Sequence, residues 1–184
     1  MSTLRRLPSA LRGPSGPVPF VRLAGVIAVV VAALLLTAVP AVVTAWTPNA
    51  YAATAERELR TLTNQARASA GRSALRLNAT LATIARGRSR DMAVRDYFAH
   101  EDPDGDLVFD QLDRARFCYR LAGENIGYTT YPDAVAVATV QDMFMRSSSH
   151  RENILGRSWD SFGIGAFTLD GAKMLYTVVF ADRC

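Results

Sequence analysis

The chain contains two histidines, and each borders a short apolar motif. His100 ends the sequence Tyr-Phe-Ala-His, and His150 begins the sequence His-Arg-Glu-Asn-Ile-Leu. Between them in the chain lies Gly-Glu-Asn-Ile, which supplies Glu124. Imidazole transfers protons near neutral pH and binds transition metals, and two neutral imidazoles with one carboxylate can hold Zn²⁺ with a water in the open position. His100, His150 and Glu124 are therefore the candidate metal ligands.

Two other interpretations of these side chains stay open. Glu124 can act as an orienting partner, bound to the imidazole nitrogen that does not face the metal. Alternatively, all three side chains can hydrogen-bond backbone groups and hold layers of the fold together, as buried polar groups commonly do. For Asn125 we expect such a structural role, because asparagine often bonds nearby backbone.

Features that would indicate catalysis are weak in this sequence. The serines at 147–149 precede His150, but adjacency does not establish a serine–histidine pair, and no Gly-x-Ser-x-Gly motif occurs. The acids at 101–106 resemble calcium ligands, yet the segment lacks the final glutamate of an EF-hand loop, so we expect a solvated turn. These residues support no assignment of enzymatic activity.

The amino-terminal part has the pattern of a targeting segment. Residues 1–22 carry four arginines and no acid, and residues 23–45 are mainly apolar. This pattern predicts either a cleaved export signal, with 46–53 as the cleavage region, or a retained membrane anchor of about 20 residues. With either alternative, the positive-inside rule places residues 54–184 outside the cytoplasm, secreted or anchored to the membrane.

The net charge of +4 also comes from this segment. The chain has 21 basic and 17 acidic residues, so removing the four amino-terminal arginines leaves a formally neutral exported part. No basic patch interleaved with aromatic residues is present, which argues against nucleic acid as a partner. Membrane contact is expected only through the amino-terminal segment, and we expect a monomer.

Both cysteines, Cys118 and Cys184, lie in the exported part, where disulfides persist. They can form a single disulfide that closes a loop of about 66 residues and removes roughly 4 kcal/mol of unfolded-chain entropy. Two free, buried thiols are the alternative.

Hydrophobic periodicity predicts helices first and strands last within residues 54–184. Helices are expected over 54–70, from the cap Asn78 to about 95, over 109–116, over 132–145 and from His150 onward. Arg88 is among the arginines expected on the solvent side of the second helix. Residues 162–168 and 174–180 are rich in β-formers and are joined by an Asp-Gly turn. This order favours one α+β domain in which helices cover an antiparallel sheet.

These pieces together resemble the CAP superfamily, and most closely its bacterial SCP-like branch. The resemblance extends from about residue 56 to 180. Five motifs occur in the family's order: Asn64–Arg67, Tyr97–His100 with Pro103–Gly105, Gly123–Ile126, His150–Leu155, and the closing strands around Phe162–Gly165 and Tyr176–Phe180. The resemblance implies a three-layer α-β-α sandwich with a central antiparallel sheet.

The resemblance also implies a cleft that holds two histidines and usually two acids. By position, His100, Glu124 and His150 would occupy this cleft. The second acid is missing, because Ser147 stands where the animal and plant branch has a glutamate, and Phe144 stands where that branch has a tryptophan. Ser147 and Asn125 are therefore expected as neighbours of the cleft and not as ligands.

Three functions remain open for the exported domain. The favoured one is a binding or interaction module whose cleft can hold Zn²⁺ or another divalent metal, with an unknown extracytoplasmic partner. The second is a metal-assisted hydrolase of peptide or envelope polymer. The third is a carrier of lipid- or sterol-type apolar ligands, which a sizeable apolar groove outside the polar cleft would favour.

Overall fold

The structure is a computed structural model that describes residue 47 and residues 49–184. The targeting segment expected over 1–45 therefore lies outside the described residues. The described elements are β1 (Ala50–Tyr51), α2 (Ala53–Ser69), β2 (Arg76–Leu77), α3 (Ala79–Val94), α4 (Val108–Arg114), β3 (Tyr119–Thr129), α5 (Asp133–Arg146), α6 (Ser148–Leu155), β4 (Ser161–Thr168) and β5 (Met174–Arg183). None of the helices in this part of the chain is both long and apolar enough to span a bilayer.

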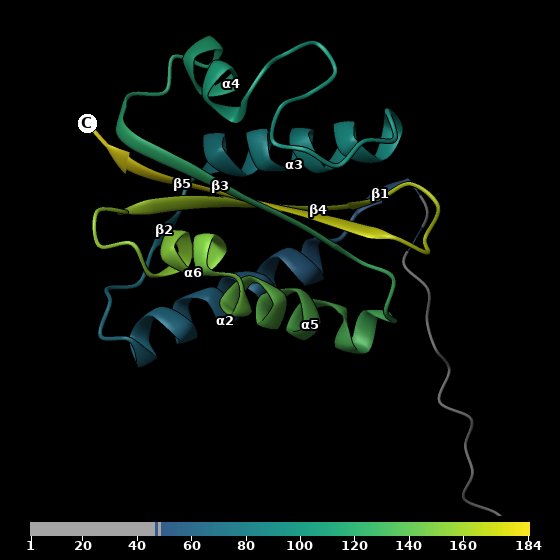
Figure 1. The fold of residues 1–184 in the computed structure, drawn as a ribbon, viewed down its shortest axis with the longest axis horizontal. Helices are drawn as coiled ribbons and strands as arrows, with labels where there is room; N and C mark the ends of the chain where they lie inside the picture. The colour runs from purple at the N-terminus through teal and green to yellow at the C-terminus, as the bar shows by residue number, and fades with distance from the viewer. Residues whose placement is uncertain (1–46, 48) are drawn as a thin grey trace, which may run out of the picture. The chain divides into compact units, whose positions relative to one another are not determined.

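The elements form three layers around one sheet (Figure 1). Helices α3 and α4 cover one face of the sheet, and α2, α5 and α6 cover the other. The strand order is β1-β4-β5-β3, with the short β2 paired to β4. The β3–β5, β4–β5 and β1–β4 pairs are antiparallel, and only the two-residue β2 pairs parallel. The predicted α-β-α sandwich is thus confirmed, and β3 is the edge strand on one side.

Sequence patterns located most elements but not β3. Asn78 caps α3 as expected, because its side-chain oxygen accepts a hydrogen bond from the amide of Leu81 at 3.1 Å. The hairpin between β4 and β5 contains Gly171 with φ of 77°, consistent with the Asp-Gly turn. The strand β3 escaped detection because its central residues, Gly123 to Gly127, are buried on both faces and show no polar–apolar alternation.

Two glycines of β4 let α3 lie directly against the sheet. A Cβ at Gly163 would stand 2.0 Å from the backbone of Leu81, and a Cβ at Gly165 would stand 2.3 Å from the backbone of Ala85. Both neighbours are main-chain atoms of α3, so the helix would have to move away to make room. The Gly-Ile-Gly sequence therefore sets how closely the α3 layer, which carries much of the candidate site, approaches the sheet.

The disulfide between Cys118 and Cys184 is present and confirms the predicted pairing over two free thiols. It joins the residue before β3 to the residue after β5, and the amide of Cys184 also donates to the carbonyl of Cys118 at 3.4 Å. The cross-link therefore fastens the last residue of the chain to the start of the edge strand that carries Glu124.

We expect reduction of the disulfide to lower the free energy of unfolding by about 4 kcal/mol, because a loop of this length regains its closure entropy. Urea unfolding of the full chain with and without reductant measures the difference. The Cys118→Ser/Cys184→Ser double variant should match the reduced protein and should not respond to reductant. Equal stability of the oxidised and reduced proteins would contradict the prediction.

The substitution Gly165→Ala should destabilise the fold by several kcal/mol, because overpacking a helix backbone costs about 1–3 kcal/mol or more. Gly87→Ala is the matched control: Gly87 lies within α3 with open space around its Cβ position. That change should stabilise the protein by up to about 1 kcal/mol through helix propensity. Thermal or urea unfolding compares the two, and equal effects would refute the role assigned to Gly165.

Candidate functional site

Glu124 occupies the middle of β3 and is anchored by a buried arginine. Its side chain is 3% exposed, and that of Arg88 is 0% exposed. The Nε of Arg88 donates to Oε1 of Glu124 at 3.1 Å. The other carboxylate oxygen, Oε2, lies 2.7 Å from Nδ1 of His100. Both oxygens of Glu124 are therefore engaged by the protein, one by a cation and one by an imidazole.

The placement of Arg88 corrects the expectation that it faces solvent. Besides Glu124, its guanidinium donates to the hydroxyl of Tyr97 at 2.8 Å and to the carbonyls of Ala99 and His100 at 2.9 and 2.7 Å. A buried cation is tolerated when its donors are satisfied and an anion lies beside it. Arg88 thus fixes both the carboxylate and the loop that carries His100.

The sequence did contain a signal for this burial. Leu81, Ala85, Arg88 and Met92 follow helical spacing, and all four are buried in the structure. Three other arginines in and after this helix, Arg86, Arg90 and Arg95, suggested that position 88 belongs to its polar face. The apolar stripe was the more reliable guide, because it includes position 88.

His100 presents one ring nitrogen to solvent. Its side chain is 53% exposed. Because Nδ1 faces the Glu124 carboxylate at 2.7 Å, the neutral ring carries its proton on Nδ1 and donates it to Glu124. This tautomer leaves the lone pair on Nε2, the nitrogen that is available to a metal or to a ligand donor.

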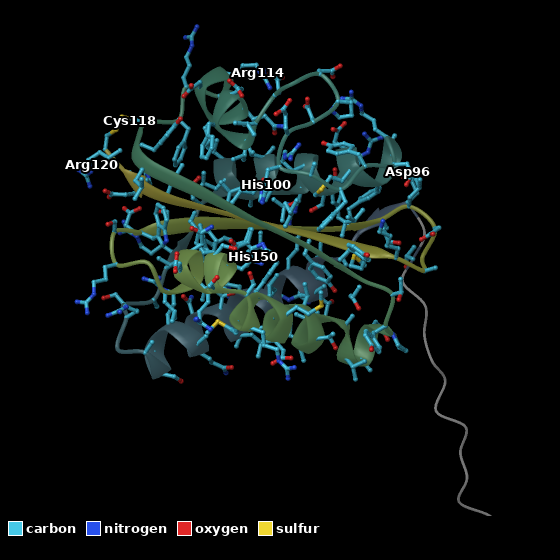
Figure 2. All side chains as sticks on the ribbon, viewed as in Figure 1. Asp96, His100, Arg114, Cys118, Arg120 and His150 are labelled. Carbon is cyan, nitrogen blue, oxygen red and sulfur yellow. A yellow bond between two sulfur atoms is a disulfide. The ribbon has the colours of Figure 1, made fainter. Side chains whose placement is uncertain are left out.

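His150 reaches the same region from the opposite layer. Figure 2 shows His100 on the α3 side and His150 on the α6 side of β3. The ring of His150 packs edge-on against Phe144, with centroids 5.1 Å apart. Its pKa lies below the ordinary histidine value, first because burial disfavours the charged ring and second because His100 opposes another positive charge. His150 is therefore neutral at pH 7.

Asn125 ties α6 to β3, as its sequence context suggested. Its amide donates to the carbonyl of His150 at 3.0 Å, and its oxygen accepts from Asn153 at 2.8 Å. Asn153 also donates to the backbone carbonyl of Glu124 at 3.2 Å. This network sets the position of the helix that carries His150 relative to the strand that carries Glu124.

An apolar hollow of about 240 Å³ adjoins His150. Its polar members are Ser147 and His150. We call it the apolar hollow; its other lining residues are Phe98, Ile126, Gly127, Tyr128, Val140, Met143 and Phe144. Ser147, expected from the sequence as a neighbour of the cleft, thus borders a carbon-lined space.

Fewer than three side chains of this region are arranged as ligands for one metal ion. Among the described residues, no group of three or more histidine, cysteine, aspartate or glutamate side chains is arranged to hold a metal ion. Glu124 has both oxygens engaged, which is the arrangement of an orienting partner. The imidazoles of His100 and His150 are the remaining donors among the three candidate ligands.

The other acids considered from the sequence are engaged elsewhere. Oδ1 of Asp102 accepts from the amides of Asp104 and Asp106 at 2.9 and 3.0 Å. Asp104 also pairs with Arg95 at 2.7 Å. The 101–106 segment is therefore a self-capped turn. Within the described chain, the serine hydroxyls at 147–149 make no hydrogen bond to His150, and those of Ser147 and Ser149 lie 3.2 Å apart.

Comparison with known proteins agrees with this architecture. Residues 60–180 match the model of the cysteine-rich secretory protein family, CAP. YkwD of Bacillus subtilis, an uncharacterized protein, is 36% identical over 112 residues, which are 60% of this chain and 41% of that relative. The chain thus spans about two fifths of the length of this curated relative.

Solved structures give the same result. An extracellular protein with an SCP domain from Bacillus anthracis matches with a TM-score of 0.61 at 28% identity, over 71% of this chain and 41% of that chain. A cysteine-rich secretory protein from Staphylococcus aureus matches with a TM-score of 0.57 at 25% identity, over 71% and 38%. The family match covers most of the chain, and the relatives above are bacterial. The chain belongs to the CAP family, in its bacterial SCP-like branch.

Proposed function

We propose that this protein is an extracytoplasmic binding module whose His100–His150 pair holds a divalent metal ion such as Zn²⁺. The observation that carries the proposal is the chain of contacts from Arg88 through Glu124 to Nδ1 of His100. It directs the free Nε2 of His100 outward, while burial keeps His150 neutral. A metal ion requires imidazole nitrogens whose lone pairs are free, and this arrangement orients one such nitrogen on His100.

The location outside the cytoplasm rests on two independent observations. The amino-terminal sequence has the pattern of an export signal or anchor. The Bacillus anthracis structure is that of an extracellular protein. We propose that the domain acts at the cell surface when the amino-terminal segment is retained and in the medium when it is cleaved.

A bound divalent ion would supply positive charge and open coordination positions for a ligand. His100 and His150 would hold it, and Glu124 would orient His100 without binding the metal itself.

This geometry does not support the hydrolase alternative. The Glu124 carboxylate is bound to Arg88 and His100 and is not free to activate water. The carrier of apolar ligands remains a second candidate, favoured by the apolar hollow of about 240 Å³.

We expect the full chain to bind Zn²⁺ with an affinity in the micromolar range, roughly −8 kcal/mol, since only two protein ligands are available. Titration calorimetry should show that His100→Ala and His150→Ala each abolish measurable binding. Glu152→Ala, an exposed change two residues from His150, is the control and should bind like the parent. Retained binding in both histidine variants would disprove the site.

The affinity should depend on pH in a defined direction. Protons compete with the metal for imidazole nitrogens, so affinity should fall as the pH is lowered past the ordinary histidine value of about 6.5. Because the pKa of His150 lies lower, its neutral form persists to more acidic pH than that of an exposed histidine. Affinity that rises on acidification would contradict this mechanism.

Glu124→Gln should reduce Zn²⁺ affinity by about 10- to 100-fold, the typical effect of losing an orienting partner. It should also cost about 3–5 kcal/mol of stability, because Arg88 remains buried without its anion. Glu56→Gln is the matched control: Glu56 is 7% exposed and pairs with Arg86 between α2 and α3. That variant should lose stability but keep the parent's Zn²⁺ affinity. Equal affinities of the Glu124→Gln variant and the parent would refute the orienting role.

A further inference from the structure

We propose that a pocket between α2 and α3 binds a phosphate group through Arg57, Arg60 and Arg86. The pocket measures about 120 Å³ and is lined by residues of α2, α3, β2 and β4. Because the strand order is β1-β4-β5-β3, this pocket lies on the side of the sheet away from β3 and its histidines. The inference therefore goes beyond the proposed function and needs no metal ion.

The pocket lies where β4 has a gap between its outer strand partners. β1 pairs with β4 at residues 167–168, and β2 pairs with β4 at residues 161–162. Ile164 falls between these two pairings and lines the pocket. Helix α2 covers one face of the sheet and α3 covers the other (Figure 1). Side chains of the two helices can therefore meet around this edge, and Arg86 of α3 does pair with Glu56 of α2.

Of the described residues that line the pocket, four are ionised: three arginines and one glutamate. Glu56 is 8% exposed, and its carboxylate accepts from Nε and Nη2 of Arg86 and from the amide of Ala166. Its charge is thus neutralised by Arg86. The Arg86 side chain is itself 43% exposed, and Nη1 makes no hydrogen bond to any described residue. Arg86 therefore keeps a donor for an additional acceptor.

Arg57 and Arg60 supply charge that no acid of the protein balances. Arg57 donates to the hydroxyl of Thr54 at 3.1 Å, which is a neutral partner. Within the described part of the chain, Arg60 makes no side-chain hydrogen bond or ion pair. The two side chains are three residues apart on α2, a spacing at which like charges repel each other. An anion between them would remove this repulsion.

The shape of the pocket favours a phosphate group. Its remaining lining is small or apolar: Ala53, Leu77, Ala82 and Ile164. The volume has room for a few water molecules or one small anion. Arginine donors are available from two helices, and a tetrahedral phosphate can accept from several guanidinium groups at once, whereas a carboxylate has two coplanar oxygens.

The pocket is open on one side to a wider hollow of about 440 Å³, which shares Arg60 and Leu77 with it. Polar residues of α2 line this hollow, among them Thr61 and Gln65. A group attached to the phosphate therefore has space beside Arg60. The same chemistry could come from free phosphate or from the phosphodiester of a lipid headgroup.

The test is a titration of the full chain in metal-free Tris buffer with a nonionic detergent that contains no phosphate. Inorganic phosphate should bind with a dissociation constant of about 1 mM or lower at low ionic strength. NMR signals of the Nε–H groups of Arg57 and Arg60 should shift during the titration. About 1 M NaCl, which shortens the Debye length to about 3 Å, should weaken binding. Acetate should bind at least about tenfold more weakly than phosphate.

Two pairs of variants locate the site. Arg60→Gln should weaken phosphate binding at least about tenfold, because a charge-assisted hydrogen bond is lost. Arg157→Gln removes the same charge from an exposed position outside the pocket and should bind like the parent. Ala53→Glu adds a carboxylate to the lining and should abolish binding, whereas Ser69→Glu, at the other end of α2, should not. Arg60 and Ala53 are exposed, so urea unfolding should give parental stability for both variants.

Glycerophosphoglycerol, the soluble headgroup of phosphatidylglycerol, separates the two sources of phosphate. Binding of this diester within about tenfold of inorganic phosphate would support a headgroup ligand, and binding of inorganic phosphate alone would support the free anion. The proposal would be overturned if neither compound bound at about 10 mM. Parental affinity in an Arg57→Gln/Arg60→Gln double variant, or acetate binding as tight as that of phosphate, would overturn it as well.

Discussion

The buried pair of Arg88 and Glu124 connects the layers on which the candidate site depends. Arg88 projects from α3, Glu124 from the edge strand, and the loop after α3 is held by Arg88 through the carbonyls of Ala99 and His100. Removing one member of such a pair typically costs about 3–5 kcal/mol, because the other charge is left buried. The pair therefore couples the stability of the fold to the orientation of His100, and a change in one alters the other.

The edge position of β3 explains how two histidines far apart in sequence lie on either side of one strand. His100 follows a helix on one face of the sheet and contacts Glu124, and His150 lies on a helix of the other face, where its carbonyl accepts from Asn125 (Figure 2). Asn125 and Asn153 hold the second helix in place. Ile126, Gly127 and Tyr128 of the same strand line the apolar hollow, so a polar and an apolar surface adjoin along β3.

Much of this arrangement followed from sequence, and the exceptions have physical causes. The cap at Asn78, the Asp-Gly hairpin and the Cys118–Cys184 pairing are local or combinatorial features and were predicted correctly. The three-layer α-β-α sandwich was implied by the family resemblance and is also correct. The strand β3 was not classified, because burial on both faces removes the alternation that marks a strand. The burial of Arg88 was indicated by its helical spacing with Leu81, Ala85 and Met92 but not by its residue type. The apolar hollow depends on tertiary packing, which the sequence does not indicate.

The central claim is that Glu124, held by Arg88, fixes His100 with its proton on Nδ1 and its lone pair on Nε2. Long-range proton–nitrogen NMR spectra of the imidazole rings at pH 8 report this tautomer directly. The account predicts that neutral His100 is in the Nδ1–H form, unlike free histidine, which favours protonation of Nε2. A His100 ring protonated on Nε2, or an even mixture of the two tautomers, would contradict the account.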